Sequence, residues 1–355
     1  MEDKENCPYV DSIKNLAYIA RVAQLLPIHG KDLVELAVIR GWKCIVKKGS
    51  FKVGDLGVYL GINAVPDFSD PNFQFLALEG FDRIKTVNLD GVVSQGLLGP
   101  LEWLSDRGVK NISRFMEGDS VAVEMGVSNF VPPEESNQYE RKSRAMFPSC
   151  VPKTDALRIQ HDPEGSLDAI RNRDITVTRK EDGCSCTVLY NKGVYQLCGR
   201  NFIWNDADRQ GIGAHYFEMQ EKYNLKTKVA ALGRNIAIQG EICGPDINEN
   251  RMELKSRILS IFDAFDIDKQ AYLSFDELGR LCAELGLPTV PLIYRGPANA
   301  LDLSVDGFLQ IADKTQYCEN APGEGVVVKA DAVSPSQPRV NFKAISNRYL
   351  LAYDL

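Results

Sequence analysis

The segment Lys180-Glu181-Asp182-Gly183 brings together a potential nucleophile, two carboxylates and a turn residue. It ends one strand-like run, turns at the glycine and leads into a second run at Cys184–Tyr190. A neutral lysine amine can act as a covalent nucleophile, although its usual pKa of about 10.4 must first be lowered. The pattern is weak by itself, because a charged hairpin turn explains it equally well.

Further segments that could carry chemistry follow in order along the chain. Each joins a strand-like run to a charged or aromatic residue: Cys198-Gly199-Arg200-Asn201, QGEICG with Glu241, FDAFDI with Phe262 and Phe265, GEGVVVK with Glu324 and Lys329, and NFKA with Lys343. Five weak segments in one order are together a strong signal.

This ordered series resembles the motifs of covalent nucleotidyltransferases, which include ATP-dependent polynucleotide ligases and mRNA capping enzymes. Segments flanking the series resemble stand-alone RNA ligases: Phe147-Pro148, Pro152–Asp155, Arg158–Gln160 and Phe342–Leu351. Other segments are similar to the N-terminal OB domain of nick-sealing RNA ligases of the Deinococcus/Naegleria type: Gly41-Trp42, Gly54–Tyr59 and Ser94–Leu98. DNA ligases and capping enzymes usually carry their OB domain after the catalytic domain, so the domain order also favours the RNA ligase branch.

The resemblance implies that AMP passes from ATP to Lys180 and then to an RNA 5′-phosphate, before a 3′-OH displaces it. Lys329 and Lys343 would neutralise charge on the α-phosphate, as cations do in phosphoryl transfer. The implied ligands of a hydrated Mg²⁺ or Mn²⁺ ion are the carboxylates of Glu324, Glu241 and Asp182.

The resemblance also implies contacts to the nucleotide. Phe265 would stack on adenine, Arg200 would contact phosphate or the 3′-OH strand, and Glu241 could hold the ribose hydroxyls. The full predicted nucleotide-binding set is Thr178, Arg179, Asp182, Arg200, Glu241, Phe265 and Glu324. The structural alternatives are simple: Phe262 and Phe265 as core residues, Glu324 as a turn residue, and Arg200 paired with a surface carboxylate.

Two positions depart from the family pattern. Arg179 stands where the family usually has glutamate before the lysine, and this could alter contacts on the adenine side. Asn341 stands where many relatives have the first lysine of a K-x-K motif, which removes one cation from the phosphate site.

Length and composition predict a globular protein of two domains. The chain has 355 residues, of which 44% are hydrophobic and 25% charged. We expect an α+β fold: an N-terminal OB-like β-barrel at 1–130, a linker at 131–146, and an adenylyltransferase domain of antiparallel sheets and helices at 147–355, with an ATP-grasp-like nucleotidyltransferase architecture. Val121–Met125 is expected to be a late strand of the first domain. The net charge of −7 is not typical of a protein that coats nucleic acid non-specifically.

The predicted function is an ATP-dependent RNA ligase in RNA repair, which seals RNA ends with 3′-OH and 5′-phosphate groups, and nicks in duplex above all. An RNA-binding protein on a ligase scaffold with weakened sealing is one alternative, and a capping-type guanylyltransferase is another. No window approaches the roughly 18 apolar residues of a membrane span, and the N-terminus lacks an apolar leader. We therefore expect a monomer that does not enter membranes, located in the cytoplasm or nucleus, with its nine cysteines reduced.

Overall fold

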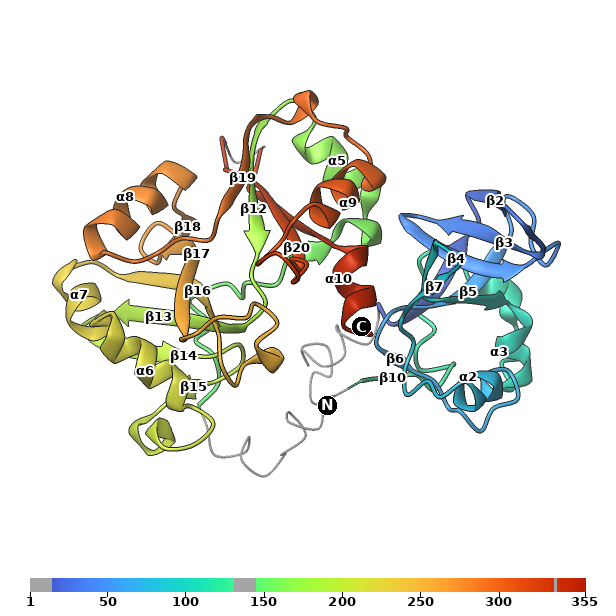
Figure 1. Ribbon diagram of the computed structural model, residues 1–355, viewed down its shortest axis with the longest axis horizontal. Coiled ribbons are helices and arrows are strands. Elements are labelled where there is room, and N and C mark those ends of the chain that lie inside the picture. Colours follow the sequence, from blue (N-terminus) through green and yellow to red (C-terminus); the bar gives the residue numbers. More distant parts are fainter. Residues whose placement is uncertain (1–14, 131–144, 335–336) are drawn as a thin grey trace. The chain divides into compact units, whose positions relative to one another are not determined.

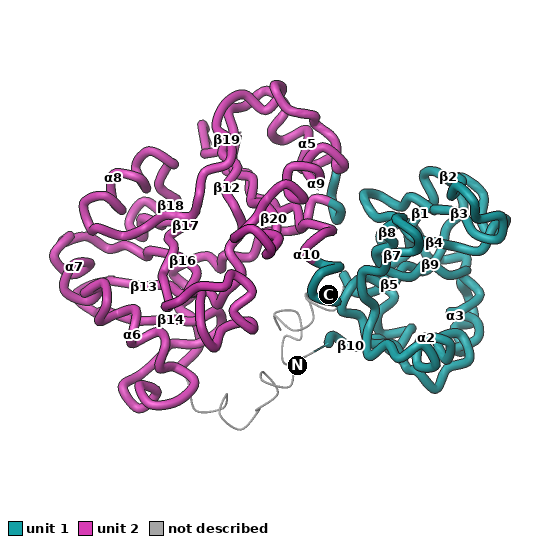
Figure 2. The backbone as a smooth tube through the Cα atoms, viewed as in Figure 1, with its two compact units in different colours: residues 1–136, 160–163, 350–355 teal, residues 137–159, 164–349 magenta. Residues whose placement is uncertain are grey.

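The computed structural model describes residues 15–130, 145–334 and 337–355, so most of the predicted linker lies outside the described residues. The chain forms two compact units (Figure 2). Unit 1 comprises residues 1–136, 160–163 and 350–355, and unit 2 comprises residues 137–159 and 164–349. Two short segments from beyond the N-terminal part of the chain, residues 160–163 and 350–355, therefore pack with unit 1. Each unit is described separately below.

Unit 1 is built from short antiparallel strands, as its turn-rich sequence predicts. One sheet has the order β1-β5-β9 and a second has the order β2-β3-β4. Their bounds are β1 (Ala17–Arg21), β2 (Gln24–Ile28), β3 (Lys31–Ile39), β4 (Trp42–Lys47), β5 (Leu56–Leu60) and β9 (Leu97–Pro100). Two smaller pairs are β7 (Thr86–Leu89) with β8 (Val92–Gln95), and β6 (Ala64–Val65) with β10 (Ser128–Asn129). The helices are α2 (Gln74–Leu78) and α3 (Glu102–Asp106).

Strand β1 separates two apolar clusters in unit 1. Its side chains alternate, so that Ala17 and Ile19 enter one cluster and Tyr18 and Ala20 enter the other. Both faces of β1 are therefore buried.

The prediction of a strand at Val121–Met125 is wrong. The segment forms a turn in which the amide of Met125 donates to the carbonyl of Val121 at 2.9 Å. Val121, Ala122 and Met125 are buried, whereas Val123 is exposed. This spacing is typical of one helical turn, and it differs from the alternation of a strand.

The first sheet of unit 2 has the strand order β11-β21-β20-β12-β19. The bounds are β11 (Leu157–Arg158), β12 (Asp174–Lys180), β19 (Leu292–Pro297), β20 (Gly325–Ala330) and β21 (Val340–Ile345). Neighbours are antiparallel except β11, which runs parallel to β21. Residues from α5 (Pro163–Ile170) and α9 (Val305–Asp313) share its apolar core, and both helices lie beside the sheet in Figure 1.

The second sheet of unit 2 has the order β15-β14-β13-β16-β17-β18. The bounds are β13 (Cys184–Asn191), β14 (Val194–Cys198), β15 (Ile203–Trp204), β16 (Ile236–Cys243), β17 (Ile258–Asp266) and β18 (Ala271–Tyr272). Side chains of α6 (Ala214–Lys222), α7 (Leu225–Ala231) and α8 (Phe275–Leu285) complete the core on this sheet. The helix expected at Glu277–Leu285 is confirmed as α8. A capping box between Ser274 and Glu277 starts α8, and Gly286, with φ of 60°, ends it.

The two sheets of unit 2 are joined by the three residues between β12 and β13. Strand β12 ends at Lys180 in the first sheet, and β13 begins at Cys184 in the second. The residues Glu181, Asp182 and Gly183 therefore lie where the chain passes from one sheet to the other. The strands predicted around this segment are confirmed, and so is the α+β fold class.

No helix among the described residues is long and apolar enough to cross a membrane. The eight cysteines within these residues are all free thiols, in agreement with the expectation.

Candidate active site

Lys180 and Glu324 meet because the strand that ends at Lys180 is the neighbour of the strand that begins just after Glu324. Lys180, the last residue of β12, is paired in register with Gly325, the first residue of β20. Glu324 directly precedes this strand. The Nζ atom of Lys180 lies 2.6 Å from Oε2 of Glu324, and both side chains are largely buried. Two motifs separated by more than a hundred residues thus form one ion pair.

Two glycines beside this ion pair pack closely against the backbones of other strands. A Cβ atom on Gly183 would lie 2.2 Å from the carbonyl oxygen of Ile242, and one on Gly325 would lie 2.1 Å from that of Ala344. Gly325 also has φ of +141°, a conformation that side chains disfavour. The glycines of the K-x-D-G and G-E-G segments are therefore required by packing.

Glu241 joins the same group from the second sheet. It lies on β16, opposite Ser185 of β13, one residue after the start of that strand. Burial raises the pKa of Glu241 to about 8, and the negative charges of Glu324 and Asp182 add to this effect against the attraction of Lys180. We call Lys180, Asp182, Glu241 and Glu324 the junction cluster.

Lys180 is a protonated ammonium ion in this arrangement. Burial disfavours its charge, but attraction by Glu324 and Glu241 is stronger, and its pKa rises to about 12. The expected lowering of this pKa by neighbouring cations is therefore absent from the unliganded protein. One ammonium group faces three acidic side chains, and Glu241 is largely protonated at neutral pH. The carboxylates of Asp182 and Glu324 still outnumber the ammonium group within the cluster.

Asp182 is held in place by three side chains that the sequence analysis did not single out. Its carboxylate accepts from Nδ2 of Asn248 at 2.7 Å and from the hydroxyl of Tyr349 at 2.6 Å. The guanidinium of Arg251 lies 3.6 Å away. Tyr349 comes from α10 (Asn347–Ala352) and is buried. Burial and the nearby Glu324 raise the pKa of Asp182, whereas these hydrogen bonds oppose the rise.

Lys343 lies on the neighbouring strand β21, opposite Val327 of β20, and Arg158 of β11 is its partner on the other side. Burial, together with the positive charges of Lys180 and Arg158, lowers the pKa of Lys343 to about 8. No hydrogen bond or ion pair of its amine is found among the described residues. This fits the prediction that Lys343 faces a phosphate, which stays a prediction.

Lys329 is not a member of the junction cluster. Its Nζ atom donates to the carbonyl of Phe262 at 2.7 Å and lies 3.0 Å from Oδ2 of Asp263. Arg339 binds the other oxygen of Asp263 at 2.5 Å. We call Asp263, Lys329 and Arg339 the pocket cluster. The predicted role of Lys329 at the α-phosphate is corrected here, because its amine is engaged in this separate group.

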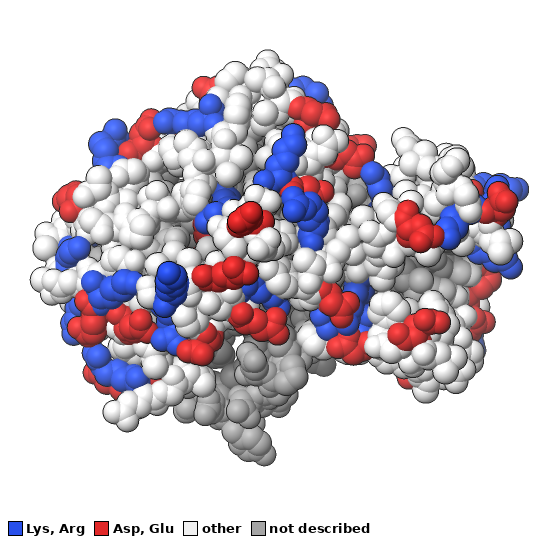
Figure 3. All heavy atoms as spheres, in the orientation of Figure 1, with Lys and Arg blue, Asp and Glu red and all other residues white. Residues whose placement is uncertain are grey.

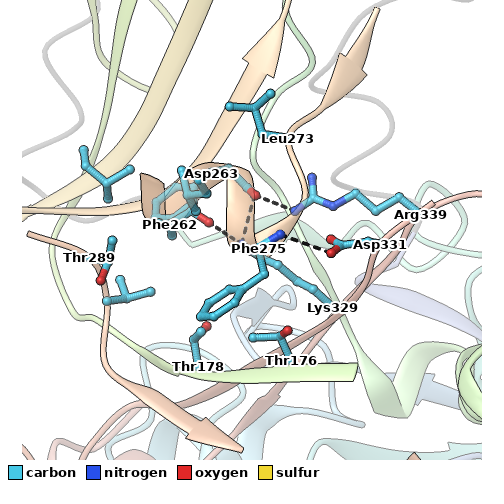
Figure 4. Close-up of a pocket in the computed structure, with 14 residues that line it drawn as sticks. Thr176, Thr178, Phe262, Asp263, Leu273, Phe275, Thr289, Lys329, Asp331 and Arg339 are labelled. Atoms are coloured by element: carbon cyan, nitrogen blue, oxygen red, sulfur yellow. Dashed lines mark hydrogen bonds and ion pairs between the residues drawn. The ribbon is translucent and has the colours of Figure 1, made fainter. Parts of the chain in front are cut away.

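The pocket cluster forms part of the wall of a pocket in unit 2 (Figure 4). Thr176 and Thr178 of β12 line the same pocket, together with Phe262 of β17 and Val290. On β12 these threonines alternate with residues of the opposite face, and Lys180 is the next residue on the threonine side. The predicted position of Thr178 beside a nucleotide therefore has a cavity to support it.

Phe262 lies on the wall of this pocket, and Phe265 does not. Phe265 is only 3% exposed and packs with Val151 and Tyr272 in a separate apolar cluster. Its predicted stacking on adenine does not fit that position. A β-bulge opposite Gln239 and Gly240 leaves Phe262 without a partner on β16. Repeating F-D-x spacing alone does not distinguish the two rings, because the bulge is not visible in the sequence.

Arg179 and Arg200 both have carboxylate partners. Arg179 binds Glu181 at 2.9 Å. Arg200 is two-thirds exposed and binds Asp155 at 2.8 Å, which is the surface pairing that the sequence left open. Asn341 lies opposite Lys329 in the β20–β21 pair, and its buried side-chain oxygen finds no hydrogen-bond partner in the part of the chain that the structure describes.

The junction cluster has the chemistry of a site for a hydrated divalent cation. Within 15–130, 145–334 and 337–355, no three His, Cys, Asp or Glu side chains are close enough to hold a metal ion directly. Oxygen ligands and an excess of negative charge suit an ion such as Mg²⁺, which keeps several of its waters. On the face in Figure 3, basic and acidic side chains are interspersed, so this face offers no broad basic surface.

Comparisons with known proteins address both units. The RNA ligase family model matches residues 173–345, and an OB-fold domain model matches residues 16–101. Among solved structures, the chain is similar to Naegleria gruberi RNA ligase with pyrophosphate, at 29% identity and a TM-score of 0.80, covering 96% of this chain and 98% of that one.

A variant of the same N. gruberi ligase with ATP and Mn matches at 28% identity and a TM-score of 0.81, covering 96% of this chain and 99% of that one. Another variant, with AMP and Mn, matches at 29% and 0.79, covering 95% and 98%. No curated protein gave a significant match. The expected order of an OB domain followed by a nucleotidyltransferase domain is confirmed.

Proposed function

Because the chain belongs to the ATP-dependent RNA ligases with an N-terminal OB domain, we propose that it joins RNA 3′-OH and 5′-phosphate ends through an AMP intermediate on Lys180. ATP and a divalent metal ion are its cosubstrate and cofactor, as the N. gruberi ligase complexes with ATP and Mn indicate. The observation that carries the proposal is the contact of Lys180 with Glu324 beside Glu241 and Asp182.

In the first step the amine of Lys180 attacks the α-phosphorus of ATP. A bond forms between nitrogen and phosphorus, pyrophosphate leaves, and the lysine loses a proton. Since the pKa of Lys180 is about 12 in the free protein, its pKa must be lowered so that the amine can lose its proton before attack. A bound divalent ion would supply positive charge beside Glu324, Glu241 and Asp182 and so reduce their attraction for the lysine proton.

Lys343 supports this step from β21. With a pKa of about 8 its amine is protonated in most protein molecules at neutral pH, and a phosphate oxygen would stabilise that charge further. The resulting ion pair would offset negative charge that develops as pyrophosphate departs. Phe262, on the wall of the pocket beside Thr178, is the aromatic ring that would contact the adenine.

The later steps transfer AMP to the RNA 5′-phosphate and then form the RNA bond. An oxygen of the RNA 5′-phosphate attacks the phosphorus of the lysine-bound AMP, and the amine of Lys180 leaves and takes up a proton. The RNA 3′-OH then attacks the 5′-phosphate, and AMP leaves with its own phosphate. One ATP is consumed for each RNA bond formed.

Labelling with α-³²P nucleotides followed by a denaturing gel tests the proposal. We expect ATP to label the protein in the presence of Mg²⁺ or Mn²⁺, and Lys180→Ala or excess EDTA to abolish the label. Lys226→Ala, at an exposed position of α7, is the matched control and should label normally. A Lys180→Ala protein that still labels would overturn the assignment of the nucleophile.

The same gel separates the two alternative functions. Labelling by GTP without labelling by ATP would favour a capping-type guanylyltransferase. A folded protein that binds RNA but takes no label from either nucleotide would favour an RNA-binding protein on a ligase scaffold.

The proposed substrate is RNA with a nick in a duplex, bound in part by unit 1. OB domains bind nucleic acid through cations and stacking. Three exposed lysines lie at the end of β4 or between β4 and β5 in this unit: Lys47, Lys48 and Lys52. Replacing these three lysines by alanine should weaken binding of a nicked duplex, more at 50 mM than at 200 mM salt. Labelling of Lys180 should be unchanged, and an unchanged affinity for the nick would exclude these lysines.

A further inference from the structure

Tyr317 connects the backbone of the two residues that form the central ion pair. Its hydroxyl donates to the carbonyl oxygen of Lys180 at 2.8 Å and accepts from the amide of Glu324 at 3.1 Å. One oxygen atom therefore spans the end of β12 and the residue before β20. Both hydrogen bonds go to backbone atoms, so they fix where the two side chains start and leave their functional groups free.

Arg179 holds the ring of Tyr317. Its guanidinium carbon lies 4.9 Å from the centre of the ring, and its Nη1 atom donates to the carbonyl of Gln316 at 2.9 Å. The other side of the guanidinium binds the carboxylate of Glu181, which is buried. A glutamate at position 179, as in the family pattern, could not make these contacts, since it would repel Glu181. The departure at this position therefore has a structural use.

The segment that carries Tyr317 is itself closed by hydrogen bonds. The amide of Tyr317 donates to the carbonyl of Ala321 at 2.9 Å, and that of Gly323 donates to Thr315 at 2.9 Å. A Cβ atom on Gly323 would lie 2.5 Å from Oγ1 of Thr315, so the return of the chain to Glu324 is tightly packed. Tyr317 is thus presented by a constrained loop.

We propose that Tyr317, supported by Arg179, is a positioning residue that sets the placement of Lys180 relative to Glu324 for formation of the lysine–AMP bond. This inference rests on the proposed function, because it concerns the step in which Lys180 is the nucleophile. A shift of a reacting group by a fraction of an ångström is enough to slow such a step. Tyr317 touches only protein backbone at this point, so it acts at the chemical step and leaves ATP affinity unaltered.

Tyr317→Phe keeps the ring for Arg179 and removes both hydrogen bonds. We expect the rate of Lys180 adenylylation at saturating ATP to fall about tenfold, the size of effect that loss of hydrogen bonds of ordinary strength produces. The half-saturating ATP concentration should change less than twofold, since no contact to the nucleotide is removed. Tyr294→Phe is the matched control, because its hydroxyl donates to the carbonyl of Pro297 on an exposed part of β19.

Arg179→Lys provides a second, independent variant. It keeps a positive charge for Glu181 but loses the planar contact with Tyr317 and the bond to Gln316. A fall of about threefold in the same rate is expected. The double variant should be no slower than Tyr317→Phe by more than about a factor of two, since both changes act through one contact.

The outcomes separate this inference from the proposed function. If the unaltered protein takes no AMP on Lys180, the proposed function fails. If it does, an unchanged rate in Tyr317→Phe overturns the inference, and so does a loss that follows ATP affinity or that Tyr294→Phe reproduces. If Tyr317→Phe does not fold, Arg179→Lys decides in the same way: a slower rate with unchanged ATP dependence supports the inference, and an unchanged rate overturns it.

Discussion

The junction cluster and the pocket cluster both consist of acidic and basic side chains, but they have different roles. In the pocket cluster, Lys329 and Arg339 share the carboxylate of Asp263, and each of its oxygens has a close cationic partner. In the junction cluster, a single ammonium group faces three acidic side chains, and one of them, Glu241, has a pKa of about 8. The paired charges of the pocket cluster fix the wall of the pocket. The junction cluster, whose charges are not balanced, can bind a cation and change its protonation.

The largest effect is expected from Glu324→Gln. This change removes the carboxylate nearest to Lys180 and should lower the rate of adenylylation about 10³-fold, since a single charged group at the reacting centre is removed. Because the junction cluster has an excess of negative charge, the free energy of unfolding should change by less than about 1 kcal/mol. Labelling kinetics and urea unfolding measure the two quantities. A large loss of stability would contradict the contrast drawn between the clusters.

Asp263→Asn should show the opposite balance. It leaves Lys329 and Arg339 buried without their shared carboxylate, and the free energy of unfolding should fall by about 3 kcal/mol. Urea unfolding measures this change. Asp266→Asn on the same strand is the control, because the only cation paired with Asp266 among the described residues is the exposed ammonium of Lys269 at 3.6 Å. The amide of Lys269 also donates to Oδ1 of Asp266 at 3.0 Å, and an asparagine oxygen can still accept this bond. The cost should therefore stay below about 1 kcal/mol. Equal costs for the two variants would mean that the pocket cluster does not stabilise the fold.

The two phenylalanines of FDAFDI sharpen the role of the pocket. Phe262→Leu should raise the half-saturating ATP concentration about 20-fold, because stacking of an aromatic ring on a base is lost. Phe265→Leu should leave that concentration unchanged and lower the unfolding temperature instead, since its ring is buried among apolar residues. Titration of initial labelling rates with ATP distinguishes the two. The reverse result would restore Phe265 as the adenine contact.

The smallest effect concerns the protonation of Lys180. Its pKa of about 12 in the free protein means that the amine stays protonated, and hence unreactive toward amine reagents, throughout the neutral range. Removing the attraction of Glu324 favours the neutral amine, so Glu324→Gln should lower this pKa by about one pH unit. The pH dependence of modification at Lys180, followed by mass spectrometry, measures it. A pKa below 10 in the unaltered protein would contradict the electrostatic account.

Much of the junction cluster could be predicted from the sequence because its members lie at strand ends within short, ordered segments. Lys180, Glu241 and Glu324 each lie beside a short apolar run, and such runs bounded by glycine or charged residues predict strands. Gly183 is predicted to turn the chain, whereas the close backbone contacts at Gly183 and Gly325 are seen only in the structure.

The pocket cluster and the tyrosines could not be predicted because they depend on register and on loops. A single β-bulge decides that Phe262 lies on the wall of the pocket. Lys329 and Asp263 belong to different sheets of unit 2, and no local sequence pattern predicts how close these two sheets lie. Tyr317 stands in a segment without strand or motif signals, and Tyr349 lies in the Phe342–Leu351 segment without a role that its position indicates. Only the folded chain brings their hydroxyls to Lys180 and Asp182.

The packing of residues 350–355 with unit 1 has a consequence for the order in which the protein acquires its structure during synthesis. The amide of Thr86 donates to the carbonyl of Leu355 at 3.0 Å, and Lys85 binds the carboxylate of Asp354 at 2.7 Å. Domains usually fold one after another as they leave the ribosome. Here unit 1 cannot form all of its contacts until unit 2 has been translated. Unit 1 is therefore synthesised first but completes its fold last.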